Sequence, residues 1–129
     1  MNKNSQLYLF LGSINAGLSV ALGAFGTHGL KNYIPENMLK TYNTGVEYHF
    51  YHSLGLFSVA LAFYFLPKSK LLKWSGRLMM TGILLFSFSL YVLSITGIRS
   101  IGIVTPLGGT ALVTAWALLA IAVKKSKTT

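Results

Sequence analysis

The chain has 129 residues, of which 53% are hydrophobic and only 10% are charged. Soluble domains average about 25% charged residues, and small proteins have the most surface to cover, so this composition excludes an ordinary soluble domain and a disordered chain. The formal net charge is +9 and cysteine is absent, which excludes disulfides and thiolate metal sites.

The predicted elements are four apolar segments, each close to the ~20 residues that cross a bilayer. They cover residues 7–25, 46–66, 78–96 and 102–123. Pro67 closes the second span, and Pro106 falls in the first turn of the fourth, where proline is tolerated. No segment alternates with period two, which argues against a barrel. We therefore predict an all-α fold, a four-transmembrane-helix bundle that forms one integral membrane domain over residues 1–129.

The first span contains no ionisable residue between Leu7 and Phe25. Lys3 before the apolar run and the small residues of 21–24 also fit a secretory signal with a cleavage site. The run is long enough to cross the membrane and continues without a break into the next segment. We therefore expect the span to be retained, with cleavage as the alternative.

The outer loop, residues 26–45, joins the first two spans. Pro35 suits the first position of a helix, and Glu36 and Asn37 would lie near the positive end of its dipole. We predict a short helix over residues 35–42. Its polar residues exclude it from hydrocarbon, so we expect it on the membrane surface or as a cap on the bundle.

The basic residues predict the orientation of the four spans. One side, with both termini and the middle loop, holds eight of them: Lys3, Lys68, Lys70, Lys73, Arg77, Lys124, Lys125 and Lys127. The opposite side holds three: Lys31, Lys40 and Arg99. The positive-inside rule then places both termini in the cytoplasm, with the protein in the cell (plasma) membrane and Trp74 as a headgroup-level anchor. Because the charges flank apolar spans, membrane lipids are the expected partners and nucleic acid is not.

Polar side chains within the spans are expected to face the bundle interior, because they are costly in lipid. Asn15 lies near the middle of the first span, so its amide should find partners on neighbouring helices. The third span is rich in hydroxyl groups that can bond to their own helix or across to another: Thr81, Ser87, Ser89, Ser94 and Thr96.

The groups that could do chemistry gather towards the outer end of the predicted bundle. They are His28, Glu47, Tyr48, His49, His52 and Arg99. On a helix His49 and His52 lie about 60° apart and share a face, whereas Glu47 points about 160° away from His49. This pattern leaves three interpretations open: a structural polar network, a ligand or proton-relay site, and a metal site made by His28, His49 and His52.

Two common catalytic and phosphate-binding motifs are missing from the sequence. No nucleophile elbow appears, and the PLGG of residues 106–109 lacks the lysine and hydroxyl of a phosphate-binding loop. A non-enzymatic role is therefore favoured, and no cofactor is implied.

Four stretches carry a resemblance to a known family. They are residues 22–31 (LGAFGTHGLK), 44–56 (TGVEYHFYHSLGL), 86–91 (FSFSLY) and 105–116 (TPLGGTALVTAW). The chain resembles the family of small four-helix membrane proteins of unknown function that includes bacterial YwdK and animal transmembrane protein 256. The resemblance implies four membrane crossings and marks His28, Tyr48 and His52 as family-like positions. At position 49 the family more usually has glutamine, and position 47 varies.

The leading functional hypothesis is a binding protein. The bundle would hold a lipid-like or quinone-like amphiphile, or a partner helix from a second copy or another membrane protein. Its outer mouth would be formed by the candidate polar cluster: His28, Glu47, Tyr48, His52, Arg99 and Asn15. One alternative is a small proton-coupled or cation transporter, which is weakened by the lack of a mid-membrane acid in the last three spans. The other is a His-based metal-binding membrane factor or enzyme.

Overall fold

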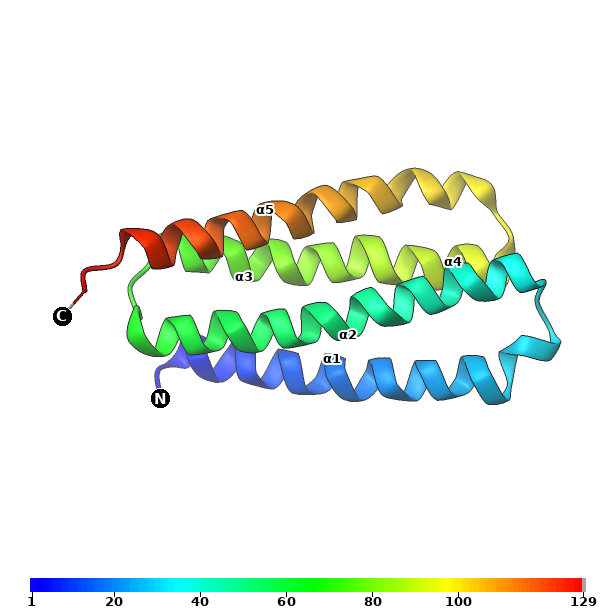
Figure 1. The fold of residues 1–129 in the computed structure, drawn as a ribbon, viewed down its shortest axis with the longest axis horizontal. Coiled ribbons are helices and arrows are strands. Elements are labelled where there is room, and N and C mark those ends of the chain that lie inside the picture. The colour runs from blue at the N-terminus through cyan, green and yellow to red at the C-terminus, as the bar shows by residue number, and fades with distance from the viewer. Residues whose placement is uncertain (129) are drawn as a thin grey trace.

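The computed structural model describes residues 1–128 as helices packed side by side (Figure 1). The helices are α1 (Lys3–His28), α2 (Glu36–Phe65), α3 (Lys70–Gly82), α4 (Ser89–Thr96) and α5 (Val104–Lys125). A π-helical segment, Ile83–Phe88, joins α3 to α4 so that they form one continuous rod. Short 3₁₀ turns, Leu30–Asn32 and Arg99–Ile103, precede α2 and α5. Over residues 1–128 the protein is thus all-α with four helical rods, which confirms the predicted class.

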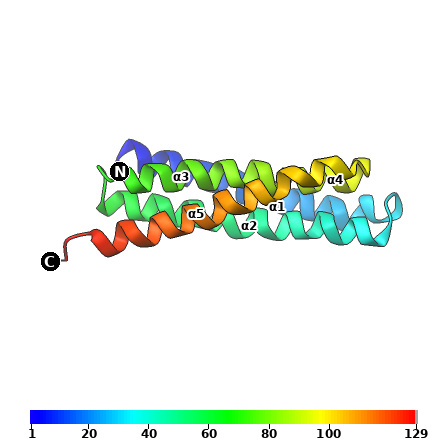
Figure 2. The same ribbon diagram turned by 90° about the horizontal axis from the view of Figure 1, so that it is seen from above.

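Both chain ends lie at the same end of the bundle, beside the connection from α2 to α3 (Figures 1 and 2). We call this the termini end and define it by Asn2, residues 66–69 and Ser126. The turns that join α1 to α2 and α4 to α5 lie at the opposite end, which we call the far end. Pro67 directly follows the end of α2 and Pro106 lies in the first turn of α5, as predicted.

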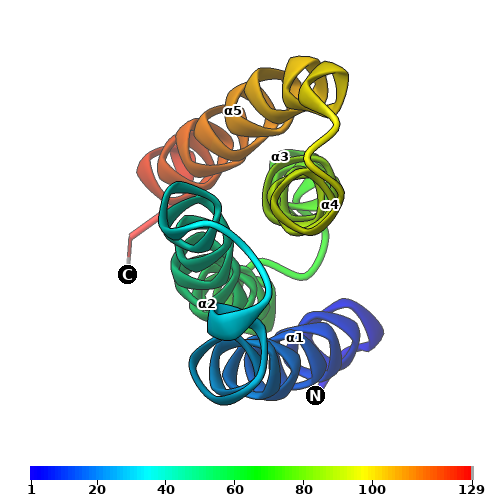
Figure 3. The same ribbon diagram turned by 90° about the vertical axis from the view of Figure 1, so that its right-hand side faces the viewer.

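The helices pack in pairs. Helix α1 packs along α2, α5 packs along α3 and the π-helical segment, and α2 joins the two pairs by its contacts with the α3–α4 rod (Figure 3). Direct contact between α2 and α5 is slight. The main apolar core includes Leu56, Phe63 and Met79, and a smaller cluster of Leu30, Tyr42 and Tyr91 lies towards the far end.

Side-chain hydrogen bonds connect α1 to α2 near both ends of the helix pair. At the termini end, Ser5 Oγ donates to the carbonyl of Ala60 over 2.8 Å. Towards the far end, the hydroxyl of Tyr42 donates to the carbonyl of Leu22 over 2.5 Å. In a membrane, apolar side chains gain little by moving from lipid into a helix contact. Interhelical hydrogen bonds of this kind therefore contribute to helix association there.

The predicted short surface helix is wrong as a separate element. Residues 36–42 form the start of α2, which continues without interruption to Phe65. Gly45 lies within this helix, and Tyr91 packs against it. A helix of 30 residues is about 45 Å long, whereas the hydrocarbon layer is about 30 Å thick. The first turns of α2 would therefore project beyond the apolar layer.

Among residues 1–128, three continuous helical stretches are long and apolar enough to cross a membrane. They are Lys3–Asn32, Lys70–Thr96 and Arg99–Lys125. The stretch that contains α2 is not among them. It carries Glu47, His49 and His52 as well as the polar residues of its first turns. The second crossing therefore stays a prediction.

Candidate functional site

The structure separates the candidate polar cluster into buried and exposed members. Asn15 is 4% exposed and His52 is 7% exposed. In contrast, His28, Glu47 and Arg99 are exposed, and Tyr48 is 39% exposed. His49, which sequence reasoning set outside the cluster, is completely buried.

The three histidines do not assemble into one site in the structure. His28 is the last residue of α1 and is exposed, whereas His49 and His52 lie in the buried part of α2. Across residues 1–128, no three His, Asp or Glu side chains come close enough together to hold a metal ion. The geometry therefore gives the predicted metal alternative of His28, His49 and His52 no support.

His49 instead connects three helices through its two ring nitrogens. Its Nε2 lies 2.8 Å from Oδ1 of Asn15 on α1. Its Nδ1 lies 2.8 Å from the hydroxyl of Tyr91 on α4. The amide nitrogen of Asn15 in turn donates to the carbonyl of Leu11 over 2.8 Å. The prediction that the Asn15 amide faces the bundle and finds partners there is confirmed.

The partners of this network determine its proton positions. Because Oδ1 of Asn15 only accepts, Nε2 of His49 carries the hydrogen, and Nδ1 then accepts from the Tyr91 hydroxyl. Each ring nitrogen of the neutral imidazole is satisfied in this arrangement. On the Asn15 side the series of bonds ends at the Leu11 carbonyl within α1 and reaches no titratable group. The arrangement is well suited to hold helices together.

Close packing positions Tyr91 for its bond to His49. A Cβ atom on Gly45 would lie 2.9 Å from Cε1 of Tyr91, so only glycine leaves room for the ring at this distance. The ring also packs edge-on against Phe88, with centroids 5.4 Å apart. Sequence reasoning missed Tyr91 and Gly45. The available signal was the placement of Gly45 four residues before His49, which puts a small residue on the same helix face, one turn from the imidazole.

His52 faces a different neighbour, across the gap between α2 and α5. Its Nδ1 lies 2.7 Å from the carbonyl oxygen of Tyr48, so that nitrogen is the donor and Nε2 is left as an acceptor. The imidazole stacks near Tyr48, with centroids 6.0 Å apart, and tilts against Trp116, with centroids 5.9 Å apart. No side chain of residues 1–128 bonds to Nε2 of His52.

A groove of about 530 Å³ opens beside His52. Its lining comes from α2, the π-helical segment and α5: Tyr48, His52, Phe86, Pro106, Gly109, Thr110, Leu112, Val113, Thr114 and Trp116. None of these residues is charged. The hydroxyl of Thr110 donates to the carbonyl of Pro106 over 2.9 Å, which leaves its oxygen free to accept. The groove is thus uncharged and largely apolar and aromatic; its polar groups include acceptors, such as Nε2 of His52, and donors, the Tyr48 hydroxyl and the Trp116 indole N–H.

The sequence matches the family described as "Protein of unknown function (DUF423)" over residues 22–109, an interval that contains His49, His52 and Tyr91. The chain belongs to this family. It is 48% identical over 120 residues to UPF0382 membrane protein YwdK of Bacillus subtilis (strain 168), an alignment that covers 93% of this chain and 98% of the relative.

Other relatives agree with this assignment. A UPF0382 membrane protein of Staphylococcus saprophyticus is 38% identical over 116 residues, covering 90% of this chain and 95% of the relative. One of Haemophilus influenzae is 38% identical over 120 residues, covering 93% and 95%. No solved structure matches this chain. The chain is thus a membrane protein of the UPF0382 family, and its link to animal transmembrane protein 256 stays a prediction.

Proposed function

We propose that this UPF0382 protein crosses the membrane four times and binds a quinol-like amphiphile in the groove between α2 and α5. One observation carries the proposal: a nearly buried histidine with a free acceptor nitrogen borders an uncharged, aromatic groove. The other predicted occupant, a partner helix from a second copy, becomes an outcome of the test below.

The surface of α2 supports a second crossing. Its buried polar groups, His49 and His52, face neighbouring helices, and each has a hydrogen-bond partner there or in its own helix. Its outward side chains nearer the termini end are large and apolar, including Leu61 and Phe65, which are both exposed. Polar groups that face the bundle interior lower the mean hydropathy of a span without preventing its insertion.

The placement of the chain ends supports an even number of crossings. Both termini lie at one end of the bundle, where the eight basic residues counted above are also found and are all exposed. Both acidic residues, Glu36 and Glu47, lie in the half of α2 nearer the far end. On the positive-inside rule the termini end is cytoplasmic, in the plasma membrane.

The chemistry of the groove favours a neutral ring with hydroxyl groups. A charged headgroup would be buried without a partner, which is costly. A quinol hydroxyl can donate to Nε2 of His52. The rings of Tyr48 and Trp116 offer faces and edges for a flat headgroup. The apolar tail would lie along Leu112 and Val113 and leave the groove towards lipid. Of the predicted polar cluster, only His52 and Tyr48 line the groove.

The test compares two ligands that differ only in their hydroxyl groups. The full-length protein in detergent is titrated with decylubiquinol and with its dimethyl ether, and bound ligand is counted by native mass spectrometry. We expect the quinol to bind about tenfold more tightly than the ether, because the ether loses one hydrogen bond worth about 1.4 kcal/mol, which corresponds to a tenfold change in Kd.

Two variants complete this test. His52→Phe keeps the ring volume but removes the acceptor, so it should abolish the preference for the quinol. His28→Ala changes an exposed histidine outside the groove and should preserve the preference. Equal binding of quinol and ether to the wild type would refute the proposal. So would a dimer that His52→Phe dissociates, which would assign the groove to a second copy.

A further inference from the structure

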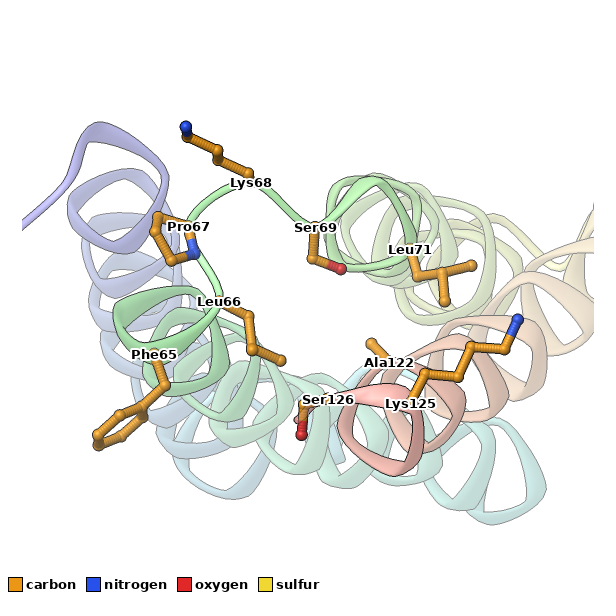
Figure 4. A pocket seen from close by; sticks show the side chains of 9 residues that line it. All are labelled: Phe65, Leu66, Pro67, Lys68, Ser69, Leu71, Ala122, Lys125 and Ser126. Atoms are coloured by element: carbon orange, nitrogen blue, oxygen red, sulfur yellow. The ribbon is translucent and has the colours of Figure 1, made fainter. Parts of the chain in front are cut away.

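A second hollow region lies at the termini end and shares no lining residue with the groove beside His52. One part, of about 410 Å³, lies between the α2–α3 connection and the end of α5 (Figure 4). It is lined by Phe65, Leu66, Pro67, Lys68, Ser69, Leu71, Ala122, Lys125 and Ser126. The other part, of about 730 Å³, continues between α2 and α5 and shares Phe65, Leu66 and Ser126. We call the two parts together the basic hollow.

The basic hollow combines an apolar wall with positive charge. Leu61, Leu66 and Leu119 form part of the wall along α2 and α5. Among residues 1–128, the charged residues that line it are Lys68, Lys125 and Lys127. In Figure 4 the Lys125 side chain extends past Leu71 at the α3 side, whereas Lys68 extends outward from the connection. No acidic residue lies in this half of the chain's fold, since Glu36 and Glu47 both belong to the far half of α2.

The start of α3 adds to the positive potential. Ser69 caps the helix by accepting from the backbone N–H of Leu72 over 3.2 Å. The N–H groups of the first turn and the positive end of the helix dipole lie at the same end of the bundle as the lysines. This end of the helix borders the hollow, because Ser69 and Leu71 both line it.

We propose that the basic hollow binds one anionic phospholipid, with Lys68, Lys125 and Lys127 around the phosphate and one acyl chain between α2 and α5. Charge complementarity selects the occupant: three cations at the rim require an anion, and the apolar wall below them requires a chain attached to it. The hollow reaches from the headgroup level at Ser69 to Ser58, about two turns into α2 from its end. This site is separate from the quinol groove and does not depend on it.

The test places the protein in nanodiscs of mixed phosphatidylglycerol and phosphatidylcholine. Native mass spectrometry then releases the protein from the nanodisc and identifies the lipids that stay bound to it. We expect one phosphatidylglycerol to be retained at least tenfold above its share of the bilayer. The triple variant Lys68→Gln, Lys125→Gln and Lys127→Gln should lose this enrichment. Because the three lysines are exposed, helix content by circular dichroism should be unchanged.

A matched control separates this site from general attraction to a basic surface. Lys3→Gln, Lys73→Gln and Lys124→Gln remove the same charge from the same end, but these residues do not line the hollow. The control should keep the enrichment. Equal loss in both triple variants would overturn the proposal in favour of diffuse electrostatics, and no loss in either would overturn it as well. Competition by free glycerol phosphate would show a site for the headgroup without a chain and would overturn the proposal too.

Discussion

Nε2 of His49 lies 2.8 Å from Oδ1 of Asn15, so the imidazole of α2 closes a hydrogen bond to the amide of α1 inside the bundle. The same ring accepts from Tyr91 on its other side. A single buried side chain thereby links three helices. Such a link specifies how the helices are rotated and how they are aligned along their axes, because both bonds require one relative placement of α1, α2 and α4.

The first prediction concerns this link. His49→Leu should destabilise the protein by about 2 kcal/mol or more, because Asn15 Oδ1 and the Tyr91 hydroxyl would be buried without partners. His49→Gln should cost less, since its amide can donate to Asn15 and accept from Tyr91. Thermal unfolding in detergent checks both variants. Equal stability of the leucine variant and the wild type would contradict the structural role.

The second prediction concerns the glycine beneath Tyr91. Gly45→Ala should destabilise the protein by about 1–3 kcal/mol, because the new methyl group would press on Cε1 of Tyr91 and on the Ser87 carbonyl. Gly17→Ala is the matched control, since nothing lies within 4 Å of a Cβ at that position. The control should be neutral or slightly stabilising, as alanine is the better helix former. If the Gly45→Ala and Gly17→Ala variants unfolded at the same temperature, the contact between Gly45 and Tyr91 would be loose enough to accept a methyl group.

The third prediction compares two buried serines on the α3–α4 rod. Ser75 Oγ donates to the carbonyl of Ala115 on α5 over 2.7 Å. Ser87 Oγ, in the π-helical segment, is buried without a partner among residues 1–128. Ser75→Ala should therefore cost about 1 kcal/mol, whereas Ser87→Ala should be neutral or stabilising. Thermal unfolding of the two alanine variants, measured side by side, tests this order, and the reverse order would contradict it.

The fourth prediction concerns orientation and uses the absence of cysteine from the chain. Single cysteines are introduced as Lys31→Cys at the far end and Thr128→Cys at the termini end. In bacterial cells whose cell wall and any outer membrane have been removed but whose cytoplasmic membrane is intact, a membrane-impermeant maleimide should label the first variant and not the second. Permeabilised cells should allow both to react. Labelling of Thr128→Cys but not Lys31→Cys before permeabilisation would reverse the proposed topology. Labelling of both would place the two positions on the same side and imply an odd number of crossings.

Sequence reasoning located the helices well and the site residues only in part. The apolar runs at 7–25, 78–96 and 102–123 each fall within a helical stretch, but the α3–α4 rod begins at Lys70, eight residues before the predicted run and within the predicted middle loop. The prolines lie at helix boundaries as expected. The short surface helix was wrong because no local signal shows that Gly45 continues the helix. Gly45 packs against Tyr91, which lies 46 positions further along the sequence.

The polar residues show the same division. The expectation that Asn15 faces the interior followed from the cost of an amide in lipid, and the structure confirms it. The resemblance marked His28 and His52 as family-like positions, and the structure leaves His28 exposed at the end of α1. His49 was set aside for departing from the family pattern, yet it makes the most complete set of side-chain bonds of the three histidines.

The amino-acid sequence by itself determined that this chain is helical and belongs in a membrane. Those properties follow from side-chain composition and its distribution along the chain, because partition into hydrocarbon depends on each segment alone. Only the tertiary structure decided which polar groups meet. Hydrogen bonds reach about 3 Å, so their formation depends on the rotation and close approach of helices that are distant in the sequence.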